Sequence, residues 1–247
     1  MSAGQPKPVR LVGAALGDRP ACPLGVCDGS GWILGPEDVA RPCECRESQL
    51  ARRRARGVAS AIPRKYRSVS FDAPPVSNLP SAAVGEIRRY VDNLEENLEA
   101  GRGAWLFGDV GTGKTSLAML VSKSALEAGH TVAIYSVPRL LAEIRRTYDS
   151  NPGETSYLDF VDRLVGVDLL HLDDLGTEKR SDWVLEQLYS IVNERYEATR
   201  AILVTSNLGE HELRDQIGER TVSRLIEICG QHMVPMSGRD LRDAAQI

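Results

Sequence analysis

Two glycines, a lysine and a threonine have the spacing with the clearest chemical meaning in this chain. Gly108 and Gly113 bracket four residues, and Lys114 and Thr115 follow directly. Because glycine has no Cβ atom, the backbone N–H groups of such a loop can turn inward around phosphate oxygens. The spacing predicts a loop that binds the phosphates of ATP, with a chance glycine-rich turn as the alternative. The predicted nucleotide-binding residues are Gly108, Asp109, Val110, Gly111, Thr112, Gly113, Lys114, Thr115 and Ser116.

Two adjacent acids supply the second chemical element. Asp173 and Asp174 directly follow an apolar segment at 167–172. A phosphate loop needs an acid that holds Mg²⁺ and its water. We therefore expect Asp173 and the Thr115 hydroxyl to bind magnesium, and Asp174 to orient or deprotonate the water that attacks the γ phosphate. The alternative is that the two acids cap the turn that follows them.

Asn207 comes shortly after another apolar segment, at 201–205. Its side-chain amide can hydrogen-bond the attacking water or the γ phosphate. Asparagine after a strand is also a common turn residue, so the residue type alone leaves both interpretations open.

Four of the five cysteines fall within one short stretch. Four residues separate Cys22 from Cys27, one separates Cys43 from Cys45, and fifteen lie between the pairs. Two close pairs joined by a glycine-rich loop can present four thiolates to a tetrahedral Zn²⁺. Such a zinc would be structural, because four protein ligands leave no open position, and free buried thiols are the alternative. We interpret Cys229 as a core residue.

Composition limits the classes of protein to consider. The 247 residues are 42% hydrophobic and 26% charged with a formal net charge of −4, which is typical of a soluble globular protein. No segment approaches the length that spans a bilayer, and the N-terminal residues lack the apolar core of a secretion signal. A cytoplasmic location is expected. The segment 46–67 carries eight basic residues and one acid, which favours either phosphate contact or a solvated linker.

Alternating strand and helix signals begin near Phe71 and must position these groups. Short apolar segments followed by polar residues, rather than by hairpin turns, predict buried strands at 104–107, 131–135, 167–172 and 201–205. Helices are expected from Lys114 onward and over 181–200. The pattern predicts an α/β fold with a parallel sheet flanked by helices, whose active groups gather at the carboxyl ends of the strands.

The chain is expected to divide into four segments. A flexible tail covers 1–20, a zinc-binding module 21–46, a basic linker 47–70 and the nucleotide-binding domain 71–247. The length suits one α/β domain with a small accessory module.

Together these residues resemble the AAA+ ATPases, and more narrowly the bacterial and phage helicase loaders of the DnaC/DnaI type, with the related IstB transposition ATPases. The narrower resemblance covers the chain from Cys22 to Arg242. It rests on an ordered series of blocks. They are Ile62-Pro63-Arg64-Lys65-Tyr66 with Phe71, Val137-Pro138-Arg139-Leu140-Leu141, Leu172-Asp173-Asp174-Leu175-Gly176, Asn193-Glu194-Arg195-Tyr196, Thr205-Ser206-Asn207-Leu208, Ser223-Arg224-Leu225 and Arg239-Asp240-Leu241-Arg242.

The resemblance implies an ATPase that assembles as a homo-oligomer on a hexameric replicative helicase and helps to place it on single-stranded DNA. In this pattern Asn207 is similar to the sensor 1 residue, Arg224 to the arginine finger of a neighbouring subunit, and Arg242 to the nucleotide-binding sensor 2 arginine. An arginine supplied in trans stabilises the charge of the transferring phosphoryl group. An ordinary surface arginine is the alternative for Arg224. The N-terminal cysteine module is implied to engage the helicase.

The expected catalytic residues are Lys114, Asp173, Asp174, Asn207 and Arg224. Two of the chain's features depart from the pattern of most AAA+ proteins. The second acid is Asp174 where many have glutamate, so its carboxylate is set back and we expect slow, partner-stimulated hydrolysis. Five residues follow Arg242, which predicts an abbreviated C-terminal lid.

A basic helix is expected over 137–148. Leu140, Leu141 and Ile144 share its apolar side, while Arg139, Arg145 and Arg146 point elsewhere. The loader resemblance places single-stranded DNA here, and positive charge beside an aromatic such as Tyr148 suits that ligand. A solvated basic face is the alternative.

Three other functions remain as alternatives. An IstB-type transposition ATPase shares the ATPase core, although the N-terminal cysteines favour a loader. A nucleotide-dependent adaptor would bind DNA and a partner with negligible turnover. A small-molecule P-loop kinase is disfavoured, because the sequence shows no pattern for an acceptor site or a kinase lid.

Overall fold

The computed structural model describes residues 22, 24–35, 39–46, 62–148, 155–238 and 240–241. The chain divides into two compact units, Met1–Leu50 and Ala51–Ile247. The predicted tail at 1–20 and most of the predicted linker at 47–70 lie outside the described residues, so the predicted segment boundaries stay predictions.

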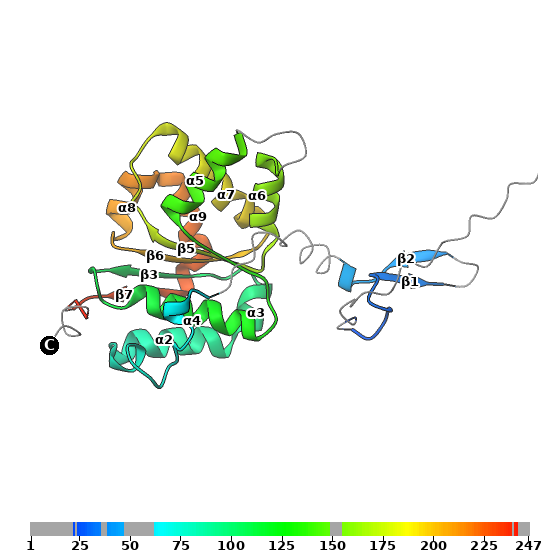
Figure 1. Cartoon of the computed structure of the whole chain (residues 1–247), viewed down its shortest axis with the longest axis horizontal. Helices are drawn as coiled ribbons and strands as arrows, with labels where there is room; N and C mark the ends of the chain where they lie inside the picture. Colours follow the sequence, from blue (N-terminus) through cyan, green and yellow to red (C-terminus); the bar gives the residue numbers. More distant parts are fainter. Residues whose placement is uncertain are drawn as a thin grey trace, which may run out of the picture. The chain divides into compact units, whose positions relative to one another are not determined.

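A five-stranded parallel sheet forms the centre of the larger unit, in the order β4-β5-β6-β3-β7 (Figure 1). The strands are β3 (Ala104–Gly108), β4 (Val132–Ser136), β5 (Leu169–Leu175), β6 (Ala201–Ser206) and β7 (Met233–Met236). The first four confirm the predicted strands. Sequence analysis missed β7, a four-residue strand that contains Pro235 and pairs only along one side, where proline is tolerated.

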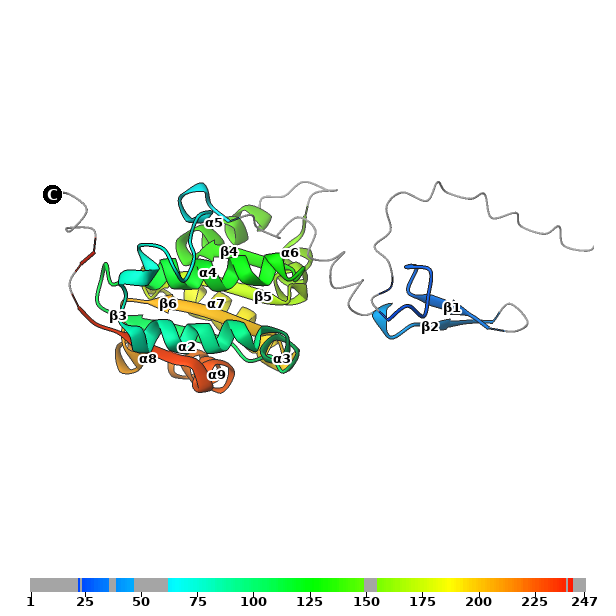
Figure 2. The ribbon, with the colours of Figure 1, turned by 90° about the horizontal axis from the view of Figure 1, so that it is seen from below.

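Helices cover both faces of this sheet, which confirms the predicted α/β class (Figures 1 and 2). One layer contains α2 (Ser81–Asp92), α3 (Leu94–Glu99) and α4 (Lys114–Glu127). The other contains α5 (Val137–Tyr148), α6 (Tyr157–Gly166), α7 (Asp182–Glu197), α8 (Glu210–Ile217) and α9 (Glu219–Cys229). Short 3₁₀ turns lie at Arg64–Tyr66, Val76–Asn78 and Gly230–His232. Among the described helices, none combines the length and apolar character needed to cross a membrane.

The strand sequences explain why two apolar layers form. Side chains alternate between the faces of a strand, so Ile202 and Val204 of β6 join the core under α5–α9. Ala201 and Leu203 join the core under α2–α4. All four are fully buried, and complete burial of an Ile, Leu or Val side chain contributes roughly 1.5–3 kcal/mol. This two-sided burial holds the ends of the strands, and the loops on them, in fixed positions.

The smaller unit contains a two-stranded antiparallel hairpin. Strand β1 (Trp32–Leu34) pairs with β2 (Ala40–Pro42), and Trp32 lies opposite Pro42. Gly25 and Gly31 have φ angles of 62° and 80°, which favour glycine in the turns beside the cysteines. Since the backbone N–H of Cys43 donates to the Gly31 carbonyl at 2.9 Å, the hairpin brings the second cysteine pair back to the first.

A buried arginine holds the α6–β5–α7 region of the larger unit together. Arg195 of α7 has no exposed surface, and burial lowers the pKa of its guanidinium to about 9. Its Nη atoms donate to main-chain carbonyls of α6, of the segment after α6, and of β6. These acceptors are Leu164, Val165, Val167, Asp168 and Ala201, at 2.6–3.3 Å. The carbonyls at the end of α6 are therefore satisfied by a cation, which also suits the negative end of the helix dipole.

Replacing Arg195 with methionine should lower the free energy of unfolding by about 3–5 kcal/mol, because several buried carbonyls lose their donors. Chemical denaturation of both proteins measures the difference. Arg220→Met is the matched control on an exposed arginine of α9 and should change stability by less than about 0.5 kcal/mol. Equal stability of the two variants would contradict the assigned role of Arg195.

Candidate nucleotide and zinc sites

The predicted phosphate loop lies between β3 and α4, as its spacing indicates. Gly108, Gly111 and Gly113 have φ angles of 123°, 75° and 90°, a region that L side chains rarely adopt. A Cβ atom on Gly113 would also lie 2.6 Å from the Leu79 side chain, so packing as well as backbone conformation requires glycine here. The loop turns directly into the first residue of α4, and a helix N-terminus favours phosphate.

Lys114 directs its charge into the loop. Its Nζ donates to the carbonyls of Gly108 at 2.8 Å and Asp109 at 2.5 Å, and the side chain is buried. The Thr112 hydroxyl closes the same turn by donating to the Asp109 carbonyl at 2.8 Å. The ammonium group thus sits beside the backbone that would surround the phosphates, where it can neutralise their charge.

Asp173 lies at the carboxyl end of β5 and contacts the first turn of α4. Its Oδ1 accepts hydrogen bonds from the Thr115 hydroxyl at 3.1 Å and the Thr205 hydroxyl at 2.7 Å. Nε2 of the buried His171 lies 3.8 Å from the same oxygen, and Nδ1 of that ring contacts the Ser122 hydroxyl at 2.9 Å. Burial raises the pKa of Asp173, but the His171 ring and the two threonine hydroxyls outweigh it and leave the pKa below its usual value. The carboxylate is therefore held in the charged form that a divalent cation needs.

Asp174 occupies an irregular point in β5. Its φ angle is 59°, and the pairing of β5 with β6 shifts between Leu172 and Leu175. The backbone N–H of Asp174 donates to the Thr205 hydroxyl of the neighbouring strand at 2.9 Å. A left-handed residue within a strand is unusual and turns the side chain away from its regular direction.

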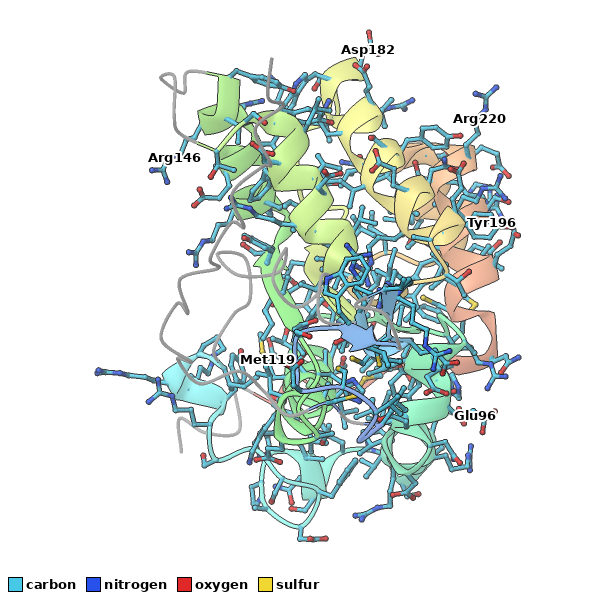
Figure 3. The ribbon with its side chains drawn as sticks, turned by 90° about the vertical axis from the view of Figure 1, so that its right-hand side faces the viewer. Glu96, Met119, Arg146, Asp182, Tyr196 and Arg220 are labelled. Carbon is cyan, nitrogen blue, oxygen red and sulfur yellow. The ribbon has the colours of Figure 1, made fainter. Side chains whose placement is uncertain are left out.

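The other predicted site residues differ in how the structure places them. Asn207 follows β6 at the same edge of the sheet, and within the described part of the chain its side chain makes no hydrogen bond. Arg224 lies on α9, where its Nη1 contacts Glu227 at 3.0 Å and its guanidinium lies 4.1 Å above the Tyr196 ring. Figure 3 shows Tyr196 where α7 lies beside α9. Arg242 lies outside the described residues.

A short segment after β7 lies against the phosphate loop. The Gly238 N–H donates to the Asp109 carboxylate at 3.3 Å, and the Leu241 N–H donates to the Gly111 carbonyl at 3.0 Å. The Asp240 carboxylate lies so close to Gly111 that a Cβ atom on this glycine would clash with it. The segment thus makes two hydrogen bonds to the loop and places a negative charge beside it.

Sequence analysis missed two polar groups near this site. Thr205 was placed at the end of the predicted strand 201–205 but given no role, although its hydroxyl contacts both acids. Glu178 was also missed; its buried carboxylate accepts the Gly176 N–H at 3.0 Å, and burial raises its pKa. A hydroxyl at the end of a predicted buried strand was the available signal for Thr205.

The smaller unit brings the four predicted cysteines together. All four Sγ atoms lie within 4.8 Å of one another, with Cys22 and Cys43 at 3.9 Å and Cys27 and Cys45 at 3.5 Å. Sulfurs bound to one tetrahedral zinc, at about 2.3 Å each, are about 3.8 Å apart. The cluster therefore has the size and the ligand chemistry of a zinc site.

The thiols of this cluster differ in the direction in which their pKa values are shifted. The backbone N–H of Cys27 lowers the pKa of Cys22 to about 6, while burial and the neighbouring thiols raise the pKa of Cys45. Four thiolates this close repel one another unless a cation balances their charge. A bound Zn²⁺ would supply that charge and deprotonate all four thiols.

Comparison with known proteins agrees with the geometry of the larger unit. The family model for "IstB-like ATP binding protein" matches residues 58–243. In Escherichia coli K12, the uncharacterised protein YdaV is 28% identical over 171 residues, which cover 67% of this chain and 65% of that protein. The replicative helicase loader DnaC of Buchnera aphidicola subsp. Schizaphis graminum is 27% identical over 168 residues, covering 67% of this chain and 66% of the loader. The chain thus spans just under two thirds of the length of these relatives.

A solved structure gives the same result. The crystal structure of the DnaC helicase loader aligns with a TM-score of 0.61 and 25% sequence identity. The alignment covers 71% of this chain and all of the solved chain. The similarity therefore includes the sheet and the helices that position the phosphate loop.

Purified protein should contain about one zinc per chain, and Cys43→Ser should lose it, because the remaining thiolates cannot complete the tetrahedral set. Elemental analysis of the folded protein measures the metal. Cys229→Ala is the matched control and should keep the zinc, since Cys229 is buried in the larger unit and bonds the Ile202 carbonyl. A folded, zinc-free wild-type chain would rule out the site.

Proposed function

The chain belongs to the IstB-like ATP-binding proteins, and from that premise we propose that it is an ATP-dependent loader of a hexameric replicative helicase in DNA replication. The observation that carries the proposal is an ATP site of this family preceded by a separate four-cysteine unit. The similarity to proteins titled as DnaC helicase loaders supports the loader role over the other functions of the family.

The geometry of the larger unit supports ATP binding and hydrolysis. Because the Thr115 hydroxyl donates its proton to Asp173, the lone pairs of its oxygen are left to face a metal ion. Mg²⁺ at this position would neutralise charge on the β and γ phosphates. Lys114 would contact the same phosphates, while Asp174 and Asn207 would orient the attacking water. The short side chain of Asp174 supports slow turnover that increases when a partner binds.

The position of Arg224 supports a role between subunits. It lies on the surface helix α9, and its contacts with Glu227 and Tyr196 hold it in its own subunit. The Tyr196 hydroxyl also donates to Glu227 at 2.6 Å. An ion pair this exposed is weak, so the phosphates of a neighbouring subunit's ATP can compete for the arginine. We assign Arg224 as the arginine finger of a homo-oligomer assembled on the helicase or on DNA.

The cysteine unit offers an apolar surface for the helicase. A hollow of about 250 Å³ beside the cysteines is lined in part by Leu24, Val26, Ile33 and Pro42. Leu24 and Val26 are 52% and 54% exposed, which is unusual for large apolar side chains. A structural zinc would help to hold this surface rigid, because one of its ligands, Cys43, lines the hollow. The unit therefore suits contact with a protein partner.

Helix α5 offers a surface for single-stranded DNA. Leu140, Leu141 and Ile144 are buried and the arginines exposed, as the sequence predicts, and Figure 3 shows Arg146 pointing away from the domain. Tyr148 stacks on Tyr157 of α6 with a centroid distance of 5.7 Å, and it meets the edge of Trp183 of α7. Unpaired bases can stack on aromatic rings, and the phosphates that join them can pair with exposed arginines, so this surface suits single-stranded DNA.

Retention of the helicase tests the proposed function. The chain should retain the hexameric replicative helicase of its own host in the presence of ATP and Mg²⁺. The pair of substitutions Leu24→Glu and Val26→Glu should reduce retention at least about tenfold, since buried charges in an apolar contact are costly. Pull-down with purified proteins measures the bound fraction.

Val39→Glu is the matched control for this experiment. Val39 is 64% exposed on the same unit but does not line the hollow, so the helicase should still be retained. Failure of the wild-type chain to retain the helicase would favour the alternatives, an IstB-type transposition ATPase or a DNA-binding adaptor with negligible turnover.

Binding to single-stranded DNA should depend strongly on salt concentration. Replacing Arg139, Arg145 and Arg146 with alanine should reduce the slope of log K against log salt by about 2, at about 0.7 for each lost phosphate contact. Fluorescence anisotropy with a labelled oligonucleotide measures both slopes. The matched control replaces the arginines Arg88, Arg89 and Arg220, which lie on α2 and α9, and should leave the slope unchanged. Equal slopes for all three proteins would exclude α5 as the DNA surface.

A further inference from the structure

Thr205 connects both acids of the ATP site to the neighbouring strand β6. Its hydroxyl donates to Asp173 Oδ1 at 2.7 Å and accepts the backbone N–H of Asp174 at 2.9 Å. The residue has no exposed surface. Because a hydroxyl has a single proton, these two contacts fix its direction, with the proton on the carboxylate and a lone pair toward the N–H.

The contact with Asp173 sets the direction of its carboxylate. The Thr115 and Thr205 hydroxyls both donate to Oδ1. Among the described residues, no hydrogen bond reaches Oδ2 of this carboxylate. One oxygen is thus occupied by the protein and the other is left for a metal-bound water, so rotation of the carboxylate would disturb both arrangements.

The contact with Asp174 maintains an irregular backbone conformation. With a φ angle of 59°, the residue lies outside the normal range for a strand, at the point where the register of β5 against β6 shifts. Its N–H donates to the Thr205 hydroxyl at this point. This buried hydrogen bond helps to hold the conformation that directs the Asp174 side chain.

We propose that Thr205 is a positioning residue for ATP hydrolysis, which orients Asp173 toward Mg²⁺ and holds Asp174 in its left-handed conformation through one buried hydroxyl. It acts through these two acids and contacts neither nucleotide nor metal itself. This inference rests on the proposed ATPase function. It assigns to β6 a role in hydrolysis in addition to that of Asn207.

The chain contains a matched control for this role. The Thr131 hydroxyl donates to Asp168 Oδ2 at 2.8 Å and accepts the Asp168 N–H at 2.9 Å. This pair of bonds has the same chemistry but lies at the amino ends of β4 and β5, the opposite edge of the sheet from the ATP site. Thr131→Val therefore removes an equivalent hydroxyl without touching the acids of the site.

The experiment compares steady-state ATPase rates of Thr205→Val, Thr205→Ser and Thr131→Val, measured with single-stranded DNA and across a range of Mg²⁺ concentrations. Thr205→Val should lower kcat about 10-fold to 100-fold and raise the Mg²⁺ concentration for half-maximal rate. Thr205→Ser, which keeps the hydroxyl, should remain within about threefold of wild type, as should Thr131→Val. Asp174→Asn sets the rate expected when the catalytic acid is lost.

Two results would overturn the inference. One is a folded Thr205→Val protein with wild-type kcat and wild-type Mg²⁺ dependence. The other is an equal loss of rate in Thr131→Val, which would show a general effect of removing a threonine hydroxyl that bonds an aspartate. If Thr205→Val does not fold, Thr205→Ala replaces it in the experiment. The inference then requires that Thr205→Ser keeps an ATPase rate near that of wild type, while Thr205→Ala does not.

A separate readout distinguishes this inference from the proposed ATPase function. If the wild-type chain does not hydrolyse ATP, the proposed function fails, and binding of a fluorescent methylanthraniloyl-ATP with and without Mg²⁺ then tests Thr205 alone. Thr205→Val should lose the gain in affinity that Mg²⁺ provides, while Thr205→Ser keeps it. An unchanged gain in Thr205→Val would contradict the positioning role.

Discussion

The site depends on the hydrogen bonds that Asp173 of strand β5 accepts from helix α4 and from the neighbouring strand β6. Strand β6 lies between β5, which carries the acids, and β3, which leads into the phosphate loop. The Asp173 carboxylate of β5 contacts both the helix that follows the phosphate loop and the strand beside it, because it accepts hydrogen bonds from Thr115 of α4 and Thr205 of β6. If these hydrogen bonds were lost, the sheet would still hold β5 and β3 in place, but the Asp173 carboxylate would lose the contacts that fix its direction.

Much of this arrangement can be predicted from local sequence. The phosphate loop is specified by glycine spacing, and the buried strands by short apolar segments such as 201–205, since both depend on neighbours along the chain. The order of the strands in space is not local, so the contact between Thr205 and Asp173 could not be predicted from the residues alone. Strand β7 escaped prediction because it is short, contains Pro235 and is stabilised by its pairing with β3.

The two units achieve order by different physical means. The larger one buries complete apolar layers on both faces of its sheet and satisfies its internal carbonyls with Arg195. The smaller one has a hairpin whose two strands are three residues long, and its buried cluster consists of three cysteines. So small a cluster buries too little apolar area to form a stable core of its own. Its four clustered thiols suit a metal that replaces the missing hydrophobic stabilisation, and its exposed leucine and valine are left available for another protein.

The described residues after β7 lie beside the phosphate loop. Gly238 and Leu241 hydrogen-bond the phosphate loop, and the Asp240 carboxylate lies against Gly111. A triphosphate entering the loop brings further negative charge close to this carboxylate. A fluorophore attached at this segment would therefore report on occupancy of the loop, whereas an affinity tag fused there would crowd it.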